Sequence, residues 1–247
     1  MRLALLLLFL ALLPFFPSGT VAENKSKQEP STEAAPVELN FEMVKEGTSP
    51  YPLTDRKDLS VNCGGGKGVL ISPRWVLTAS HCITSRSQDD GKVSVNFSGE
   101  DGTERKIGVE KVVRHPSKDV ALLLLKRPVL AKERVPVLLL RAPLLEKDGK
   151  LKIKKVAGNA VWRDIPGIGK NDNLSVPNKE ERQGKAGTSG GPWLLHSPQV
   201  GDVLIGITHG SGLAPQVGWV AKWIQESVQA HGADRLVWAT KQQALGQ

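Results

Sequence analysis

A serine set between glycines, and a histidine far upstream of it, are the residues of this chain best suited to chemistry. Ser189 lies in the run 187–192 (GTSGGP), where a tight turn can expose its hydroxyl and leave backbone N–H groups free to bind an oxyanion. A serine hydroxyl is a weak nucleophile until a neighbouring imidazole takes its proton. His81, in the run 78–82 (TASHC), can supply that imidazole.

The imidazole of such a site needs a carboxylate behind it, which fixes its tautomer and stabilises its charged form. Asp119 lies between His81 and Ser189 and opens an apolar run, 120–125 (VALLLL), that is long enough to be a buried strand. Each residue alone is more often a surface histidine, a loop serine or a charge at the end of a strand. Together they predict acyl transfer, with Ser189 as nucleophile, His81 as base and Asp119 as the orienting acid.

These three runs resemble those of the chymotrypsin/trypsin-like serine peptidases, in sequence and in their order along the chain. The resemblance implies a secreted endopeptidase that hydrolyses polypeptides through an acyl-enzyme, without a metal or an organic cofactor. It also implies an oxyanion hole formed by the backbone N–H groups of Gly187 and Ser189. Two alternatives remain: a non-catalytic peptidase homologue that binds polyanions or proteins, and an esterase that uses the same triad.

The resemblance also indicates which residues contact the substrate. Gln183 lies six residues before the nucleophile, at the base of the primary pocket, where it offers no charge to select basic side chains. Thr208, His209 and Gly210 match the strand whose backbone lines the pocket wall. His209 near the pocket would suit an acidic or polar substrate side chain, although a structural role for His209 is the favoured interpretation.

One departure from the family pattern concerns activation. The residue before the nucleophile is usually an aspartate that pairs with an amino terminus released by cleavage, and here it is Thr188. No activation sequence of the family type lies between residues 23 and 63. We therefore expect the protein to be active once its signal peptide is removed, without a second specific cut.

The N-terminus has the pattern of a secretory signal peptide. One arginine precedes a short apolar run, and small residues end at Ala22, where cleavage is expected. No other stretch is apolar for long enough to cross a bilayer. The protein is therefore expected to be secreted or periplasmic.

Two cysteines, Cys63 and Cys82, are then interpretable, because disulfides persist outside the cytoplasm. The resemblance implies that they form a disulfide beside the active site. Free or metal-bound thiols are the alternative.

The elements that must hold these residues read mainly as strands. The chain has 247 residues with 25 glycines and 16 prolines, and its apolar residues recur with period two in short runs. Only residues 217–230 read as a helix. The resemblance implies an all-β fold of two six-stranded antiparallel β-barrels packed around a central cleft, with a C-terminal α-helix. The expected boundaries are a signal peptide at 1–22, a flexible leader at 23–46, barrels at 47–128 and 129–222, and the C-terminal helix and tail at 223–247.

The chain is basic, with a formal net charge of +8. Lysines cluster at positions 147, 150, 152, 154 and 155. Alternating lysines on a strand usually form a solvated face, although a basic exported protein can also associate weakly with anionic surfaces. No aromatic residues interleave with the lysines, so we expect no sequence-specific binding of nucleic acid.

Overall fold

The computed structural model describes residues 39–45, 60–83, 93–98, 103–130, 136–145, 148, 151–157, 159–165, 167–168, 173–175, 187–210, 212–232 and 234–247. All of these belong to one compact unit, Glu38–Gln247. The predicted signal peptide and most of the predicted leader lie outside the described residues. Among the residues that are described, no helix is long and apolar enough to span a membrane.

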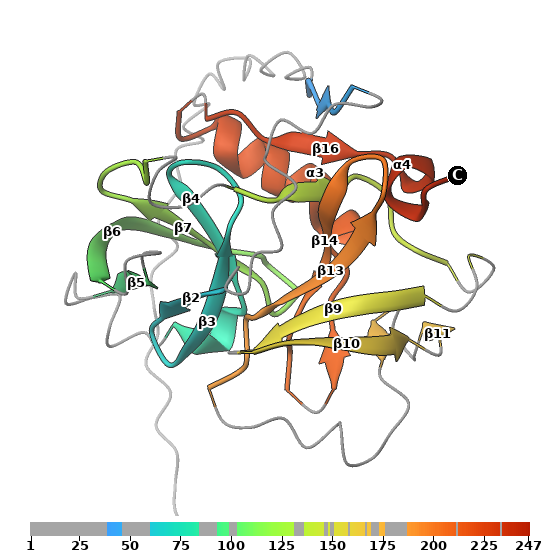
Figure 1. Cartoon of the computed structure of the whole chain (residues 1–247). Helices are drawn as coiled ribbons and strands as arrows, with labels where there is room; N and C mark the ends of the chain where they lie inside the picture. The colour runs from blue at the N-terminus through green and yellow to red at the C-terminus, as the bar shows by residue number, and fades with distance from the viewer. Residues whose placement is uncertain are drawn as a thin grey trace, which may run out of the picture. The chain divides into compact units, whose positions relative to one another are not determined.

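The first half of the described chain forms a closed six-stranded barrel (Figure 1). Its strands are β2 (Ser60–Cys63), β3 (Gly66–Leu70), β4 (Trp75–Thr78), β5 (Ser94–Ser98), β6 (Glu104–Arg114) and β7 (Ala121–Leu125). Neighbouring strands pair antiparallel in the order β2-β3-β4-β7-β6-β5. The first of the two predicted barrels is therefore present.

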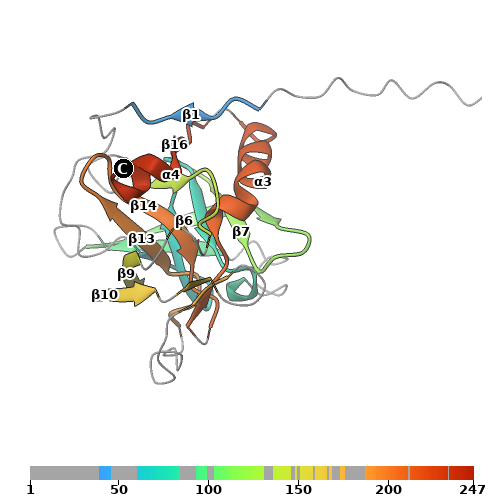
Figure 2. The ribbon, with the colours of Figure 1, turned by 90° about the vertical axis from the view of Figure 1, so that its right-hand side faces the viewer.

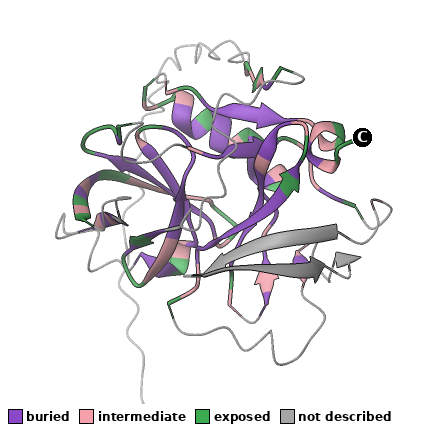
Figure 3. Cartoon of the chain, in the orientation of Figure 1, coloured by how far each residue is buried: buried purple, intermediate pink, exposed green. Residues whose placement is uncertain are grey.

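Apolar residues on both faces of β4 and β7 connect this barrel to the rest of the fold. Val76 and Leu123 face the barrel interior, where they pack with Phe97. Trp75 and Leu77 alternate with Val76 and therefore face outward, into the core that includes helix α3 (Val217–Gln229). Because both faces of the strand are buried, the barrel is fixed to its neighbour by the same residues that build it (Figure 3).

The second half differs from the predicted second barrel. Seven strands form one sheet in the order β1-β16-β8-β14-β13-β9-β10, and three short strands form another in the order β11-β12-β15. The seven are β1 (Glu42–Met43), β8 (Leu138–Leu140), β9 (Leu151–Ala157), β10 (Asn159–Ile165), β13 (Pro192–Ser197), β14 (Gly201–Ile207) and β16 (Val237–Ala239). The three are β11 (Gly167–Ile168), β12 (Leu174–Ser175) and β15 (Leu213–Ala214).

Parallel pairing explains the difference. β8 pairs parallel with both β14 and β16, and β1 pairs parallel with β16. These additions extend the sheet at one edge with segments from both ends of the chain. Within the described residues the pairings do not close a second six-stranded barrel, so the two-barrel prediction is confirmed only in part.

The C-terminal region contains the predicted helix and also two elements that the sequence analysis missed. Helix α3 buries Val220, Ile224 and Val228 along one face, which confirms the predicted helix. Beyond it, β16 follows, and then helix α4 (Lys241–Leu245), which begins with a capping box formed by Thr240 and Gln243.

Residues 42–43 were assigned to the leader from sequence, but they form β1 and lie along β16 (Figure 2).

Candidate active site

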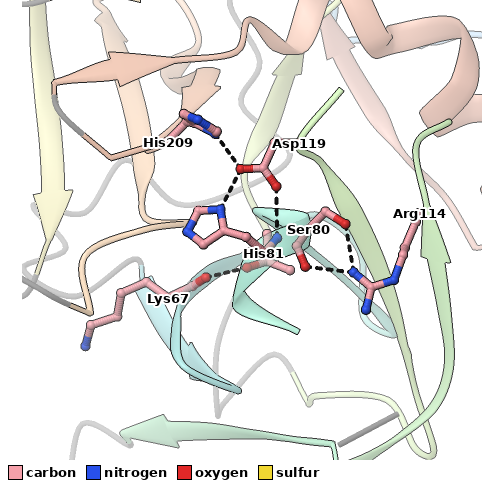
Figure 4. Close-up of polar contacts among 7 residues, drawn as sticks. Lys67, Ser80, His81, Arg114, Asp119 and His209 are labelled. Carbon is pink, nitrogen blue, oxygen red and sulfur yellow. Dashed lines mark hydrogen bonds and ion pairs between the residues drawn. The ribbon is translucent and has the colours of Figure 1, made fainter. Parts of the chain in front are cut away.

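His81 and Asp119 meet at the end of the barrel (Figure 4). His81 lies in a 3₁₀ turn, Ser80–Cys82, that follows β4, whereas Asp119 lies in the loop before β7. The backbone N–H of His81 donates to Asp119 Oδ1 at 2.9 Å, and His81 Nδ1 lies 2.5 Å from Asp119 Oδ2. One carboxylate therefore holds both the backbone and the ring of the histidine.

The charge of Asp119 follows from these contacts. Partial burial raises the pKa of the carboxyl, but hydrogen bonds from the His81 side chain and backbone, and the nearby charge of His81 and His209, outweigh burial and lower the pKa overall. Asp119 is therefore ionised at neutral pH and can only accept hydrogen bonds. Any imidazole nitrogen that bonds to it must carry a proton.

His209, just beyond the end of β14, is a second imidazole on the same carboxylate. Its Nδ1 contacts Asp119 Oδ2, the oxygen that also contacts His81 (Figure 4). The two rings lie edge to face, with centroids 5.6 Å apart. From the sequence, His209 was expected either in a pocket wall or in a structural role. This contact could not be predicted, because no local motif links two residues that far apart in sequence.

The turn that carries Ser189 is anchored to the barrel. Lys67 donates its backbone N–H to the Ser189 carbonyl at 2.7 Å. A Cβ added to Gly66 would lie 2.6 Å from the Ser189 carbonyl oxygen and 2.5 Å from Cys82 Sγ, so both groups pack closely against Gly66. Because Cys82 follows His81 directly, this contact brings the Ser189 turn beside the His81 turn.

Two positive-φ glycines shape this turn. Gly187 has φ +84° and Gly190 has φ +80°, in the region that favours glycine. A Cβ added to Gly190 would lie 2.0 Å from the Lys67 carbonyl oxygen. Glycine at 190 is therefore required both for the backbone conformation and for the close approach to β3.

Thr208 is buried and stabilises the nucleophile turn. Its carbonyl accepts from Gly190 N at 2.7 Å, and its N–H donates to the Gly191 carbonyl at 2.7 Å. Its hydroxyl donates to that same carbonyl at 3.0 Å and accepts from Trp193 Nε1 at 3.0 Å. The Thr208 side chain thus faces the core.

The remaining predicted site residues are placed as follows. The structure records no hydrogen bond between the side chains of Ser189 and His81, both of which it describes. Among the described residues, the N–H groups of Gly187 and Ser189 have no hydrogen-bond acceptor.

Gly210, a predicted pocket residue with φ +33°, lies in a tight turn in which Leu213 N donates to the Gly210 carbonyl at 3.1 Å. Gln183 and the side chains of the lysine cluster lie outside the described residues.

Arg114, at the end of β6, is a site residue that the sequence analysis missed. Its Nη1 donates to the carbonyl and the hydroxyl of Ser80, each at 2.7 Å, and its Nη2 donates to the Ile83 carbonyl at 2.5 Å (Figure 4). Ser80 begins the turn that carries His81, and Ile83 follows that turn. Arg114 therefore holds both ends of the turn.

Replacing Arg114 by Met should loosen this turn. We expect kcat to fall by about tenfold to a hundredfold with little change in KM, because small misplacements of a catalytic group cost about that much. Arg114→Lys should restore activity only in part, since an ammonium group cannot reproduce the planar fork of donors. Steady-state kinetics provide the measurement. Lys106→Met, which alters an exposed side chain on the same strand, is the control, and an equal loss in both variants would contradict the positioning role.

The two cysteines are free and buried in the structure. Cys63 Sγ donates to Thr78 Oγ1 at 3.2 Å and to the Lys67 carbonyl at 3.0 Å. Burial raises the pKa of the Cys82 thiol, and a hydrogen bond with Thr78 offsets part of this increase. Both thiols therefore lie beside the same threonine. The predicted disulfide is not formed in the structure and stays a prediction.

Comparison with known proteins decides the family. A sequence model of the family described as Trypsin matches residues 44–222. The chain belongs to the trypsin family. Membership confirms the resemblance seen in the runs around His81, Asp119 and Ser189.

Several relatives of this trypsin-family chain can be compared over part of their length. Vitamin K-dependent protein C of Rattus norvegicus is 31% identical over 132 residues, which are 49% of this chain and 28% of that protein. Trypsin-4 of Rattus norvegicus is 33% identical over 94 residues, 35% of this chain and 36% of that protein. Chymotrypsin-like elastase family member 1 of Bos taurus is 47% identical over 58 residues, 22% of this chain and 20% of that protein. The chain thus spans between 20% and 36% of the length of these curated relatives.

A solved structure shows the same fold. Neuropsin, a serine protease expressed in the limbic system of mouse brain, superposes with a TM-score of 0.52 at 20% identity. The superposition covers 69% of this chain and 94% of neuropsin. At this identity the likeness concerns the fold alone.

Proposed function

We propose that this chain is a secreted serine endopeptidase in which His81, Asp119 and Ser189 form the catalytic triad. The main support for the proposal is that Asp119 hydrogen-bonds to both the backbone N–H and the ring of His81. The Ser189 turn lies beside this pair and is hydrogen-bonded to the barrel, and the chain belongs to the trypsin family. Asp119 keeps the Nδ1–H tautomer of His81. The lone pair of His81 Nε2 is then available to a nucleophile.

The proposed reaction has two acyl-transfer steps. Ser189 Oγ attacks the peptide carbonyl carbon while His81 Nε2 takes the hydroxyl proton, and the C–N bond then breaks as His81 returns that proton to the leaving amine. Water attacks the resulting ester by the same route and restores the serine. The N–H groups of Gly187 and Ser189 are proposed to bind the oxyanion, and such a donor is typically worth about 3 kcal/mol in the transition state.

Activation by signal cleavage alone is part of the proposal. Thr188 has no carboxylate to pair with a released amino terminus, so the turn must be held by other contacts. Lys67, Thr208 and Gly191 supply hydrogen bonds at that place. These contacts support a turn that does not depend on a new terminus.

The test uses the protein without its signal peptide. Labelling by a fluorophosphonate probe, together with hydrolysis of a denatured protein faster than of short-chain esters, is the expected result. No labelling would instead favour the non-catalytic homologue. Ester hydrolysis without proteolysis would favour the esterase.

We further propose that Cys63 and Cys82 form a disulfide in the exported protein. The structure supports this through the shared contact with Thr78. A bridge closing a loop of this length is worth about 3 kcal/mol by the chain-entropy estimate. It would also fix the turn that follows His81.

Peptide mass mapping under non-reducing conditions should therefore find Cys63 linked to Cys82. Burial raises the pKa of Cys63 to about 12, so a reduced Cys63 resists alkylation in the native fold. The protein must be denatured before alkylation, because native alkylation cannot distinguish a buried thiol from a disulfide. Alkylation of both cysteines after denaturation without reductant would refute the bridge.

A further inference from the structure

We propose that His81, Asp119 and His209 form a zinc site, and that zinc bound there switches the peptidase off. The inhibition rests on the proposed function, whereas the binding does not. The three residues come from the turn after β4, the loop before β7 and the segment just after β14. Packing, and not a local motif, brings them together (Figure 4).

The ligand set suits zinc. One nitrogen from each histidine and one carboxylate oxygen lie within 4.8 Å of one another. Two imidazoles and one carboxylate, with a fourth position left for water, are a common tetrahedral set for Zn²⁺. Ca²⁺ and Mg²⁺ prefer oxygen ligands and should not compete for such a site.

The convergence of both rings on one oxygen is the feature that points to a cation. Asp119 Oδ2 accepts from Nδ1 of His81 and from Nδ1 of His209. A divalent cation placed among these three atoms would replace the two N–H···O hydrogen bonds to Asp119. Both ring nitrogens and the carboxylate oxygen would then bind the cation. The side chains of both histidines are 48% exposed and that of Asp119 is 20% exposed, so an ion can enter from solvent.

The adjustment that zinc requires is small. Zinc–ligand distances of about 2.1 Å place tetrahedral ligand atoms about 3.4 Å apart, so the rings must withdraw from Asp119 Oδ2 by about 1 Å. Both rings are half-exposed to solvent. Asp119 Oδ1 meanwhile keeps its bond from the His81 backbone at 2.9 Å, which holds the carboxylate in place.

Bound zinc is incompatible with the base function of His81. In the proposed reaction Nδ1 carries the ring proton and Nε2 accepts the proton of Ser189. When Nδ1 binds zinc, the ring proton moves to Nε2, which then has no lone pair for Ser189. Removal of the metal reverses this transfer.

The chain contains a matched control. His196 Nδ1 lies 2.8 Å from Asp202 Oδ1, so a histidine and an aspartate also meet at this second place. The His196 side chain is 52% exposed. Among the described residues, no third histidine, cysteine or carboxylate completes a metal set at that pair. His196→Gln removes a surface imidazole without changing the proposed site.

Binding is tested by calorimetric titration of zinc chloride into the mature Ser189→Ala protein, which cannot digest itself. We expect one zinc ion per chain and no heat from calcium chloride. Added His209→Gln, which keeps an N–H donor for Asp119 but removes the imidazole, should weaken binding by at least tenfold. Added His196→Gln should leave binding unchanged. Equal zinc affinity with and without His209→Gln, or a loss with His196→Gln in its place, overturns the site.

Inhibition is tested on protein that retains Ser189. Zinc should inhibit peptide hydrolysis and EDTA should restore it, whereas His209→Gln should raise the half-inhibiting concentration at least tenfold, relative to its own zinc-free rate. Activity that persists in the zinc-saturated protein overturns the switch. Zinc binding through His209 in a protein that never hydrolyses peptides supports the metal site and refutes the proposed function.

Discussion

Replacing Ser189 by Ala is expected to lower kcat for peptide hydrolysis by about four orders of magnitude or more, and to abolish fluorophosphonate labelling. Alanine removes the oxygen that would form the acyl-enzyme. The backbone hydrogen bond from Lys67 N–H to the carbonyl of residue 189 can still form. The fold should therefore remain intact. Circular dichroism and thermal unfolding, measured beside activity, separate loss of chemistry from loss of structure.

Ser94, a partly buried serine on β5, provides the control for this experiment. Ser94→Ala removes the same atom type from the barrel and should leave labelling and turnover close to those of the parent protein. Labelling of Ser189→Ala at the parental rate would show that the nucleophile is another residue. His81→Ala should lower turnover by a similar amount, because the serine and the histidine act as one unit.

Gly190→Ala is expected to have the second-largest effect, in this case through the backbone. The new methyl group would lie 2.0 Å from the Lys67 carbonyl oxygen and 2.5 Å from Thr78 Oγ1, on a backbone with φ +80°. Because β3 and β4 are each paired with strands on both sides, we expect the turn to move and the barrel to stay in place. We expect kcat/KM to fall by about a hundredfold or more, and the free energy of unfolding to drop by at least about 2 kcal/mol.

Gly187→Ala separates the two causes of that loss. Gly187 has a similar φ, +84°, but a Cβ there meets no atom within 4 Å. Gly187→Ala should therefore lower the free energy of unfolding only by the cost of a positive φ in alanine, about 1 kcal/mol. Denaturant unfolding of both variants gives the comparison, and equal losses would show that contact with the barrel contributes nothing.

Local apolar patterns account for the part of the fold that could be predicted. Trp75 and Leu77 on β4, and the leucines of β7, belong to short runs with neighbours close in sequence, and they form the first barrel. The helix at 217–229 carried an equally clear periodic face. β1 and β16 are only two and three residues long and pair with segments from the far end of the chain, so neither length nor period revealed them.

The same distinction applies to the candidate site. His81 and Asp119 stand in recognisable runs, and the structure brings them together. Arg114 stands in no such run, and the run that contains His209 indicated a pocket wall, because the contacts of both residues depend on which loops the fold places side by side. Thr240 is different, since the capping-box spacing to Gln243 was readable and was overlooked.

The pairing of β8 affects when each half of the fold can be completed during synthesis. Its two neighbours, β14 and β16, both follow it in the chain, and β16 lies almost at the C-terminus. A ribosome releases the N-terminal part first, so the β2–β7 barrel can close while β8 still lacks both partners. The proposed base and acid thus meet early, whereas the sheet that carries the strand after Ser189 is completed last. The proposed nucleophile and the strands that hold it, β13 and β14, therefore join a barrel that already carries the proposed base and acid.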